Sequence, residues 1–178
     1  MNGVSGVMSA ITVDGLVDDV ADKSNASGAN EAISAVASKV EIGGGVIKAI
    51  NGAEYAIRAY GESVSNNRGQ VNVNVKKDDK GAIIGAGSNT VQLEGNVYLG
   101  GGMDNAGASA DVSLGLNTKD SFWKGDVSNT KGSSAGIVNL YMENGASWTG
   151  NNLSGNTVNA NLDHATWTGY SNGNAMHL

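Results

Sequence analysis

One apolar pattern recurs along this chain at a nearly constant interval. It contains Ile33, Ile57 and Ile83, which are 24 and then 26 residues apart. The copies are residues 32–36, 56–60 and 82–86, and alternating apolar and polar segments follow them at 40–42, 71–75 and 91–93. A period of this size is typical of stacked repeats, in which one unit cannot bury its own apolar side. The spacing therefore predicts successive repeats that pack on one another.

Towards the C-terminus an aromatic residue marks the repeat instead. Trp123, Trp148 and Trp167 are 25 and then 19 residues apart, and a Gly follows each of them two residues later. Each Trp also comes after an alternating run; the runs are 112–116, 138–142 and 158–162. We therefore expect all three Trp residues to occupy one equivalent position of the repeat.

The alternating runs are predicted to be strands. They are short, rich in Val and Ile, and interrupted by Gly, Asn, Asp and Ser, which is typical of half-buried strands joined by turns. One segment, 30–40, also fits a helix that Asn30 would cap. Because this segment aligns with 56–60 and 82–86, which do not resemble helices, we favour a strand there too.

Composition narrows the fold class. The 178 residues include 27 Gly and a single Phe, and Asn is abundant. Gly and Asn tolerate the left-handed backbone that tight corners between strands require. Together with the period, this composition predicts an all-β fold, a right-handed parallel β-helix (β-solenoid) of roughly seven coils. Residues 28–178 would form its repeat region, and residues 1–27 an N-terminal segment that acts as a cap or a first coil.

Composition also argues against several functional classes. The chain has no Cys, which excludes disulfides and removes the usual ligands of a structural zinc ion. Its net charge is −6 and its 11 Lys and Arg form no basic stripe, so we expect no nucleic-acid partner. No apolar run has membrane-spanning length and no signal-peptide core is visible, so we expect no membrane insertion of this segment.

Four motifs carry a resemblance to a known family. They are 39–47 (KVEIGGGVI), 51–57 (NGAEYAI), 143–150 (ENGASWTG) and 164–169 (HATWTG). With the pattern at 32–36, they resemble the passenger domains of bacterial autotransporters, which use type V secretion. The resemblance covers roughly residues 28–172. It implies a right-handed β-helix that a Gram-negative cell displays or releases by means of a C-terminal β-barrel.

The resemblance also implies a function. A passenger segment would be a non-enzymatic adhesin or stalk at the cell surface or in the secreted fraction. Its partner would be a host receptor, a glycan or a protein on a sister cell, and self-association along the solenoid is a further option. Because neither an export signal nor a barrel accompanies the repeat, we expect a fragment of a longer passenger. The alternatives are a polysaccharide lyase or hydrolase on a β-helix scaffold and a structural fibre module such as a phage tailspike.

One segment matches a catalytic signature. Residues 132–136 satisfy Gly-x-Ser-x-Gly, and Asp163 and His164 follow in the order that α/β-hydrolases use. That motif needs a strand-to-helix turn, whereas a strand-like run follows it here. Adjacent Asp163 and His164 on a strand would also point to opposite faces. We therefore interpret 132–136 as a flexible corner and expect no catalytic residues.

Motifs for cofactors and metals are incomplete. Residues 85–87 resemble the start of a dinucleotide fingerprint, but Thr90 replaces the third Gly and a strand-like run follows. The only adjacent carboxylates of the repeat region lie within 77–80 (KDDK), where the flanking Lys residues favour a solvated turn over a glycosidase pair. The run 100–104 resembles half of a glycine-rich calcium repeat, but it occurs once. We expect neither a cofactor nor a metal.

The Trp residues remain as candidates for ligand contact. An exposed indole can stack on a sugar ring, so Trp123, Trp148 and Trp167 form the possible ligand surface that the sequence offers. Their equivalent spacing favours instead an internal or edge stack of rings. The exposure of the rings decides between these two interpretations.

Overall fold

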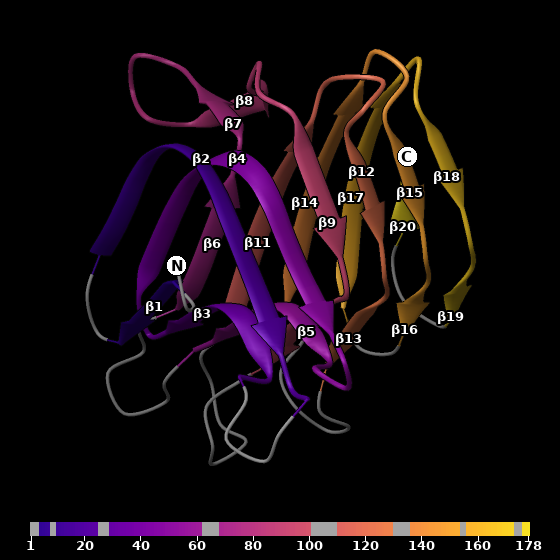
Figure 1. The fold of residues 1–178 in the computed structure, drawn as a ribbon. Coiled ribbons are helices and arrows are strands. Elements are labelled where there is room, and N and C mark those ends of the chain that lie inside the picture. Colours follow the sequence, from indigo (N-terminus) through magenta and orange to yellow (C-terminus); the bar gives the residue numbers. More distant parts are fainter. Residues whose placement is uncertain are drawn as a thin grey trace.

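The structure, a computed structural model, describes residues 4–7, 10–24, 29–61, 68–100, 110–129, 136–153, 156–172 and 176–178. Every helix or strand assigned within these residues is a β-strand, and none of them forms a helix that could cross a membrane. Nearly all of the strands pair in parallel, and two large sheets curve around one core (Figure 1). The all-β class is therefore confirmed. The alternative helix at 30–40 is wrong, because this segment contributes to two strands.

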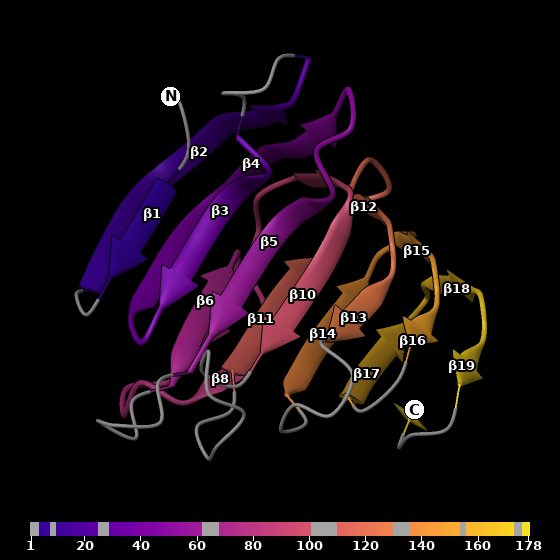
Figure 2. The ribbon, with the colours of Figure 1, turned by 90° about the horizontal axis from the view of Figure 1, so that it is seen from below.

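The smaller sheet has seven strands, which lie side by side in chain order (Figure 2). They are β1 (Val4–Val7), β3 (Glu31–Val36), β5 (Tyr55–Tyr60), β10 (Asn96–Gly100), β13 (Val127–Asn129), β16 (Asn152–Leu153) and β19 (Ser171–Asn172). Ile33 lies beside Ile57 in the ladder, and Ile57 lies beside Val97. This ladder therefore joins residues that are far apart in the sequence.

The larger sheet has eleven strands in two limbs, and both limbs meet at β4 (Lys39–Ile50). One limb contains β6 (Gly69–Val73), β11 (Ala110–Leu116), β14 (Ile137–Glu143), β17 (Thr157–Asp163) and β20 (Met176–His177). The other contains β9 (Val91–Glu94), β12 (Phe122–Lys124), β15 (Ser147–Thr149) and β18 (Thr166–Thr168). β2 (Ala10–Asp22) pairs with β4 along most of its length. The first half of β4 pairs with β6 and the second half with β9, so one strand belongs to both limbs.

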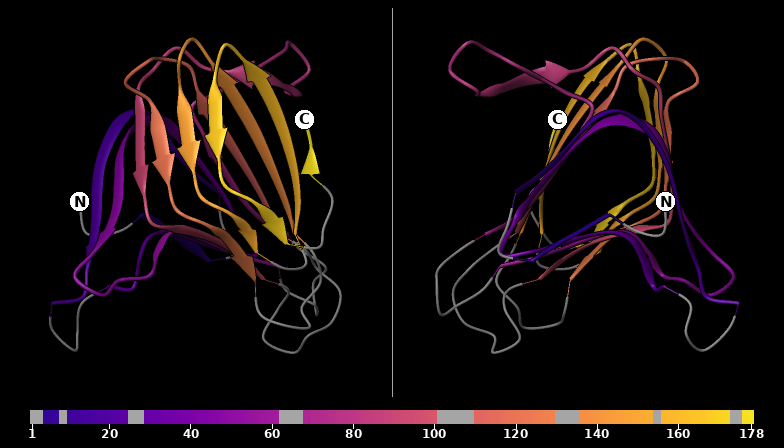
Figure 3. Two further views of the ribbon diagram at one scale, coloured as in Figure 1. Left: turned by 90° about the vertical axis from the view of Figure 1, so that its right-hand side faces the viewer. Right: turned by 60° about the vertical axis from the view of Figure 1, so that its left-hand side comes forward.

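The expected right-handed parallel β-helix of roughly seven coils is wrong. Such a helix would divide each coil into short strands at repeated corners, whereas the larger sheet continues through β4 without a break. The change of partner from β6 to β9 falls at Gly43 to Gly45, and β2 stays paired with β4 on both sides of it. The strands instead form a nearly closed, barrel-like parallel arrangement (Figure 3).

The glycines of β4 explain how the strand continues past the change of partner. A Cβ atom on Gly45 would lie 2.1 Å from the carbonyl oxygen of Val17, and one on Gly43 would lie 2.6 Å from that of Gly15. Gly44 and Gly45 also have φ values of 136° and 111°, which side-chain-bearing residues rarely adopt. The glycines thus allow β2 to pack closely on a curved β4, so the backbone bends while its pairing persists.

The ladder registers correct part of the predicted repeat. The alternating runs that contain Val40, Val71, Val112, Val138 and Val158 do align across neighbouring strands, as the sequence predicts. The copies at 82–86 and 91–93 do not align as predicted. Residues 83–86 leave the parallel sheets, and 91–93 pairs with the second half of β4 and with β12. The apolar pattern alone did not distinguish these positions, because all of them are short apolar segments.

The core is built from the inward-facing residues of the alternating runs. The five Val residues of this row, Val40, Val71, Val112, Val138 and Val158, have no exposed surface. Burial of one such side chain contributes about 1.5–3 kcal/mol. A shift of one residue in the register of any strand would turn its Val towards solvent. Burial of this row therefore selects the observed register and also stabilises the fold.

The Trp residues form a second ladder on the other limb. Trp123 pairs with Trp148, and Trp148 with Trp167, so the equivalent positions expected from the sequence are confirmed. The ring centroids are 4.7 and 5.3 Å apart, and the planes are inclined by only 6° and 16°. The rings therefore stack along the sheet, each on the ring of the neighbouring strand.

A hairpin interrupts the parallel arrangement. Its strands β7 (Val75–Lys77) and β8 (Ile83–Ala86) are antiparallel, and the hairpin projects from the rim of the sheets (Figures 1 and 3). Asn74 anchors its base: this side chain is 4% exposed, and its Nδ2 lies 2.8 and 2.9 Å from the carbonyl oxygens of Asn89 and Gly115. A Cβ atom on Gly115 would lie 2.0 Å from the carbonyl oxygen of Asn74. This glycine therefore lets the hairpin sit against β11.

Candidate functional site

A groove of about 450 Å³ lies between the outer face of the larger sheet and the β7–β8 hairpin. Its floor carries mainly amide and hydroxyl side chains, from Gln70, Asn72, Ser113, Asn139, Tyr141 and Asn159. Lys77, Gly81 and Ile83 line it from the hairpin side, and Lys39, Asp111 and Ile137 complete it. We call this hollow, as defined by these twelve residues, the amide groove.

The alternation of the strands places these side chains on one face. Successive residues of a strand point to opposite sides, so the neighbours of the buried Val row point outward. Glu41, Asn72, Ser113, Asn139 and Asn159 are the register partners that make one outward row across β4, β6, β11, β14 and β17. The same registry that builds the core therefore builds a polar ladder on the opposite face.

Hydrogen bonds run along this ladder from strand to strand. The amide of Asn72 donates to Glu41 Oε1 at 3.2 Å, and that of Asn159 donates to Asn139 Oδ1 at 2.9 Å. The amide of Asn139 lies 3.5 Å from Ser113 Oγ, which is at the long limit for such a bond. Each carboxamide has two N–H donors and an oxygen acceptor, so the ladder uses only part of this capacity. Asn139 and Asn159 are partly exposed, whereas Asn72 and Ser113 are only 8% and 3% exposed.

The charges around the groove are paired with one another. Glu41 Oε1 contacts Lys77 Nζ and also lies 2.7 Å from Lys39 Nζ, and Asp111 Oδ1 lies 2.7 Å from a guanidinium nitrogen of Arg68. Partial burial raises the pKa of Glu41, but hydrogen bonds from Lys39, Lys77 and Asn72 outweigh it and lower that pKa to about 2. Glu41 is therefore ionised at neutral pH. Each of these cations contacts a carboxylate, but Lys39 and Lys77 share Glu41, so the five side chains carry a net charge of +1.

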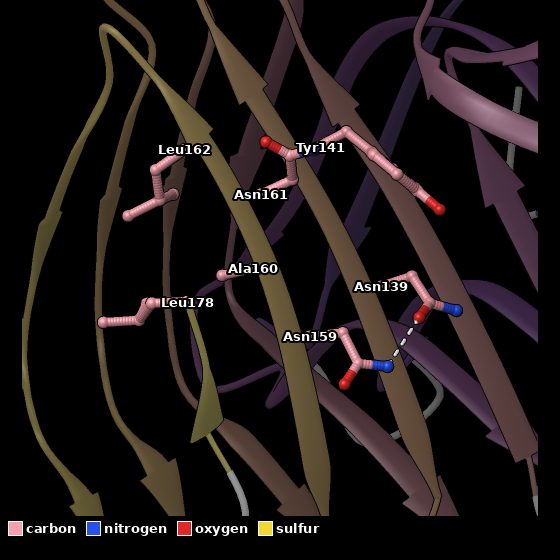
Figure 4. Close-up of a pocket in the computed structure, with 7 residues that line it drawn as sticks. All are labelled: Asn139, Tyr141, Asn159, Ala160, Asn161, Leu162 and Leu178. Atoms are coloured by element: carbon pink, nitrogen blue, oxygen red, sulfur yellow. Dashed lines mark hydrogen bonds between the residues drawn. The ribbon is translucent and has the colours of Figure 1, made fainter.

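A second hollow adjoins the groove at the last long strand. It has a volume of about 540 Å³ and shares Asn139, Tyr141 and Asn159 with the amide groove. Figure 4 shows these residues on one side of β17, with Leu162 and Leu178 on the other. The polar ladder thus continues to the edge of the hollow, where apolar side chains begin.

The structure places the three Trp residues of the possible ligand surface away from this groove. Trp123 and Trp148 have no exposed surface, and Trp167 is partly buried. Their indole nitrogens donate to the carbonyl oxygens of Gly95, Gly125 and Gly150 at 3.1, 2.9 and 3.0 Å. Two of the rings therefore have no face available to a ligand, and their position is that of the internal stack.

A cluster of aromatic rings on the smaller sheet has no counterpart in the predicted site. Tyr98 lies between Tyr55 and Tyr60, with centroid distances of 5.1 and 5.5 Å, and the guanidinium of Arg58 lies 4.5 Å from the centroid of the Tyr60 ring. Arg58 also pairs with Glu31 at 3.1 Å. Burial, with a smaller contribution from Glu54, raises the pKa of Tyr55 to about 12. The Arg58 guanidinium is already paired with Glu31, so we interpret this cluster as a structural contact between neighbouring strands of the smaller sheet.

The hydrolase-like residues do not assemble into a triad in the described residues. Residues 132–135 lie outside the described residues. Gly136, the last residue of the motif, lies beside the first residue of β17, because the backbone N–H of Thr157 donates a hydrogen bond to the carbonyl oxygen of Gly136. Asp163 ends β17 six residues further on, which is about 20 Å along a strand. The expectation that Asp163 and His164 face apart is wrong: His164 has a φ of 53°, and its Nδ1 lies 2.5 Å from Asp163 Oδ1. This exposed pair belongs to a turn.

The remaining acidic candidates have local partners. Asp78 Oδ1 accepts hydrogen bonds from the backbone N–H groups of Lys80 and Ala82, so the acidic pair at 78–79 shapes the hairpin turn. Residues 101–104 of the calcium-like run lie outside the described residues. The described part of the chain holds no group of three or more His, Cys, Asp or Glu that could bind a metal ion. Residues 85–87 end the hairpin and precede no helix, so the dinucleotide-like run lacks the helix that a phosphate site requires.

The amide groove was not predicted from the sequence. Its floor comes from four strands, neighbours among which are up to about 40 residues apart in the sequence, and single Asn, Ser and Gln residues in such strands give no motif. The available signal was the outward row of the aligned alternating runs. No protein-family model, no curated protein and no solved structure matches this chain, so the site is described by its own geometry.

Proposed function

We propose that this chain is a surface-displayed passenger segment of the autotransporter kind, an adhesin or stalk without catalytic activity. It would contact its partner through the amide groove. The observation that carries this proposal is the polar ladder, which crosses five paired strands, is partly linked by hydrogen bonds and has donors and acceptors that these bonds do not use. A host receptor, a glycan or a protein on a sister cell is the class of partner that such a surface would contact.

The chemistry of the groove favours binding over catalysis. A general acid needs a carboxyl group that holds its proton near neutral pH, which requires a raised pKa. The Glu41 carboxyl beside the groove has instead a pKa lowered to about 2 by its partners. The Asp111 carboxylate is held by Arg68 at 2.7 Å. Both carboxylates therefore act as fixed charges that position Lys and Arg side chains.

The parallel ladders favour a rigid display surface. Every floor residue of the groove lies on a strand whose inward neighbours are fully buried, such as Val71, Val112 and Val138. Binding groups on strands are held more firmly than groups on loops. The four passenger-like motifs give the proposed location at the cell surface, with this segment outside the outer membrane.

Adherence of coated particles tests this function. Beads that carry the covalently attached chain should bind to host epithelial cells or to cells of the source bacterium several-fold more often than beads coated with albumin. Soluble chain added beforehand should compete for the same sites. Antibodies against the chain should label intact source cells. Labelling only after permeabilisation would refute surface display, and a chain that cleaves polyuronates would refute the non-enzymatic assignment.

A further inference from the structure

The amide groove has the composition of a binding site for an uncharged, linear oligosaccharide, and we propose that this is its ligand. This inference rests on the proposed function, because it names the chemical class that the same groove binds. Three properties of the groove carry it: the amide ladder, the ion-paired charges and the spacing of the floor.

The ladder matches the hydroxyl groups of a sugar chain. A sugar hydroxyl both donates and accepts a hydrogen bond, and so does a carboxamide. Asn139 and Asn159 are partly exposed, and each uses one N–H group within the ladder, which leaves the second N–H group for a ligand. Asn72 is only 8% exposed and offers less. Tyr141, Ile83 and Ile137 add ring and aliphatic surface beside these amides, against which the C–H face of a pyranose can pack.

The charges argue against an acidic ligand. Lys39 and Lys77 are both engaged by Glu41, and Arg68 is engaged by Asp111. An anionic sugar would compete with these carboxylates for the same cations, because each cation already contacts a partner of opposite charge. An uncharged sugar meets no such cost, so its affinity should change little with ionic strength.

The spacing of the floor suits a chain of repeated units. Adjacent strands are about 4.8 Å apart, which is close to the length of one pyranose residue in an extended chain. The polar row of the floor crosses four strands in register, from β6 to β17, and spans about 14 Å between the outermost two, so each strand can face one sugar residue. A chain of about four sugar residues would fill this row, and longer chains would extend beyond it.

Titration calorimetry with a defined series of oligosaccharides tests the inference. The probes are β-1,4-linked oligomers of glucose and of N-acetylglucosamine with two to six residues, and oligogalacturonates of the same lengths. We expect one of the two neutral series to bind with an affinity that rises with length, levels off at about four residues and changes little between 50 and 500 mM salt. The two neutral series distinguish glucan from amino-sugar sources, and the galacturonates should not bind.

Two variants place the binding on the molecule. Asn139→Ala/Asn159→Ala removes two rungs of the ladder and should weaken binding by about tenfold or more, since the hydrogen bonds of two side chains are lost. Gln92→Ala removes an outward amide of β9 on the other limb and should bind like the wild type. Circular dichroism and thermal melting verify that both variants fold. Equal loss in both variants, or no loss in either, would place the binding outside the groove.

The outcomes separate this inference from the function on which it rests. Failure of both neutral series to bind, or binding of galacturonates alone, overturns the oligosaccharide assignment. If coated beads still adhere to cells in that case, and protease treatment of the cells abolishes adherence, the partner is a protein and the adhesin function stands. If the beads do not adhere at all, the proposed function fails first.

Discussion

At the scale of single residues, a Gly after each Trp makes the indole stack possible. A Cβ atom on Gly150 would lie 1.8 Å from the carbonyl oxygen of Gly125, and one on Gly169 would lie 1.8 Å from that of Gly150. The same carbonyl oxygens accept the indole N–H groups of Trp148 and Trp167. The recurrence of Trp-x-Gly thus has two physical causes, which are close backbone approach and a shared acceptor.

This arrangement predicts a large difference between two glycine substitutions. Gly150→Ala should lower the free energy of unfolding by about 3 kcal/mol or more, because backbone must move to admit the methyl group. Gly85→Ala should change it by less than about 1 kcal/mol, since its Cβ would meet only Glu143 Oε1, at 3.6 Å. Urea denaturation followed by Trp fluorescence measures both values. Equal effects would show that the close approach at Gly150 does not constrain the fold.

Asn74 predicts a second contrast at this scale. The φ of Asn74 is 49°, which Gly adopts more readily than Ala. The hydrogen bonds from its side-chain amide to Asn89 and Gly115 are lost equally when either residue replaces it. Asn74→Ala should therefore cost about 2–4 kcal/mol, and Asn74→Gly about 1 kcal/mol less than that. Thermal or urea unfolding of the two variants gives the comparison. A more stable Ala variant would mean that the backbone at position 74 relaxes to a negative φ.

At the scale of elements, an ion-pair network ties the β7–β8 hairpin to the sheet. Glu41 of β4 contacts both Lys77 of β7 and Lys39 of β4. The pKa of Glu41 falls from the ordinary value of 4.5 to about 2 on folding. A carboxyl with a lowered pKa stabilises the folded state above its unfolded pKa, and this contribution is lost as the pH falls through the folded pKa.

The network should therefore give a pH-dependent stability between about pH 5 and pH 2. Relative to Glu41→Gln, the wild type should be more stable at pH 7 by at most about 1 kcal/mol, since solvent screens these half-exposed groups. That advantage should shrink below pH 4.5 and vanish near pH 2. Urea midpoints of both proteins at pH 7, 5, 3 and 2 measure it. An advantage that grows on acidification would have the wrong sign for this network.

Prediction from the sequence succeeded where a pattern repeats on aligned strands. The Val rows and the Trp positions were predictable because burial imposes alternation and stacking imposes equal spacing. The segment at 83–86 failed, since an apolar run in a hairpin resembles one in a sheet. The Gly content also misled, because glycines that suit a corner equally allow a curved strand to pack closely on its neighbour, as Gly43 and Gly45 do on β2. The groove could not be predicted, since it exists only once the registers are known.

At the scale of the whole molecule, the register of the parallel strands determines both the core and the outer polar face. The inward residues of β6, β11, β14 and β17 form the core, and their outward neighbours form the floor of the amide groove. The hairpin closes this groove on one side, while the Trp limb contributes stability from inside. The molecule thus separates a buried aromatic stack from a polar outer face on the same sheet, and this polar face is the proposed binding surface.

Adherence of beads coated with groove variants is the most direct test of this separation. Three coatings are compared on the same cells: wild type, Asn139→Ala/Asn159→Ala and Gln92→Ala, each at equal surface density and with its fold checked by circular dichroism. We expect the Gln92→Ala beads to adhere like the wild type, and the double variant to lose most of its adherence. Full adherence of the double variant would contradict the assignment of recognition to the amide groove.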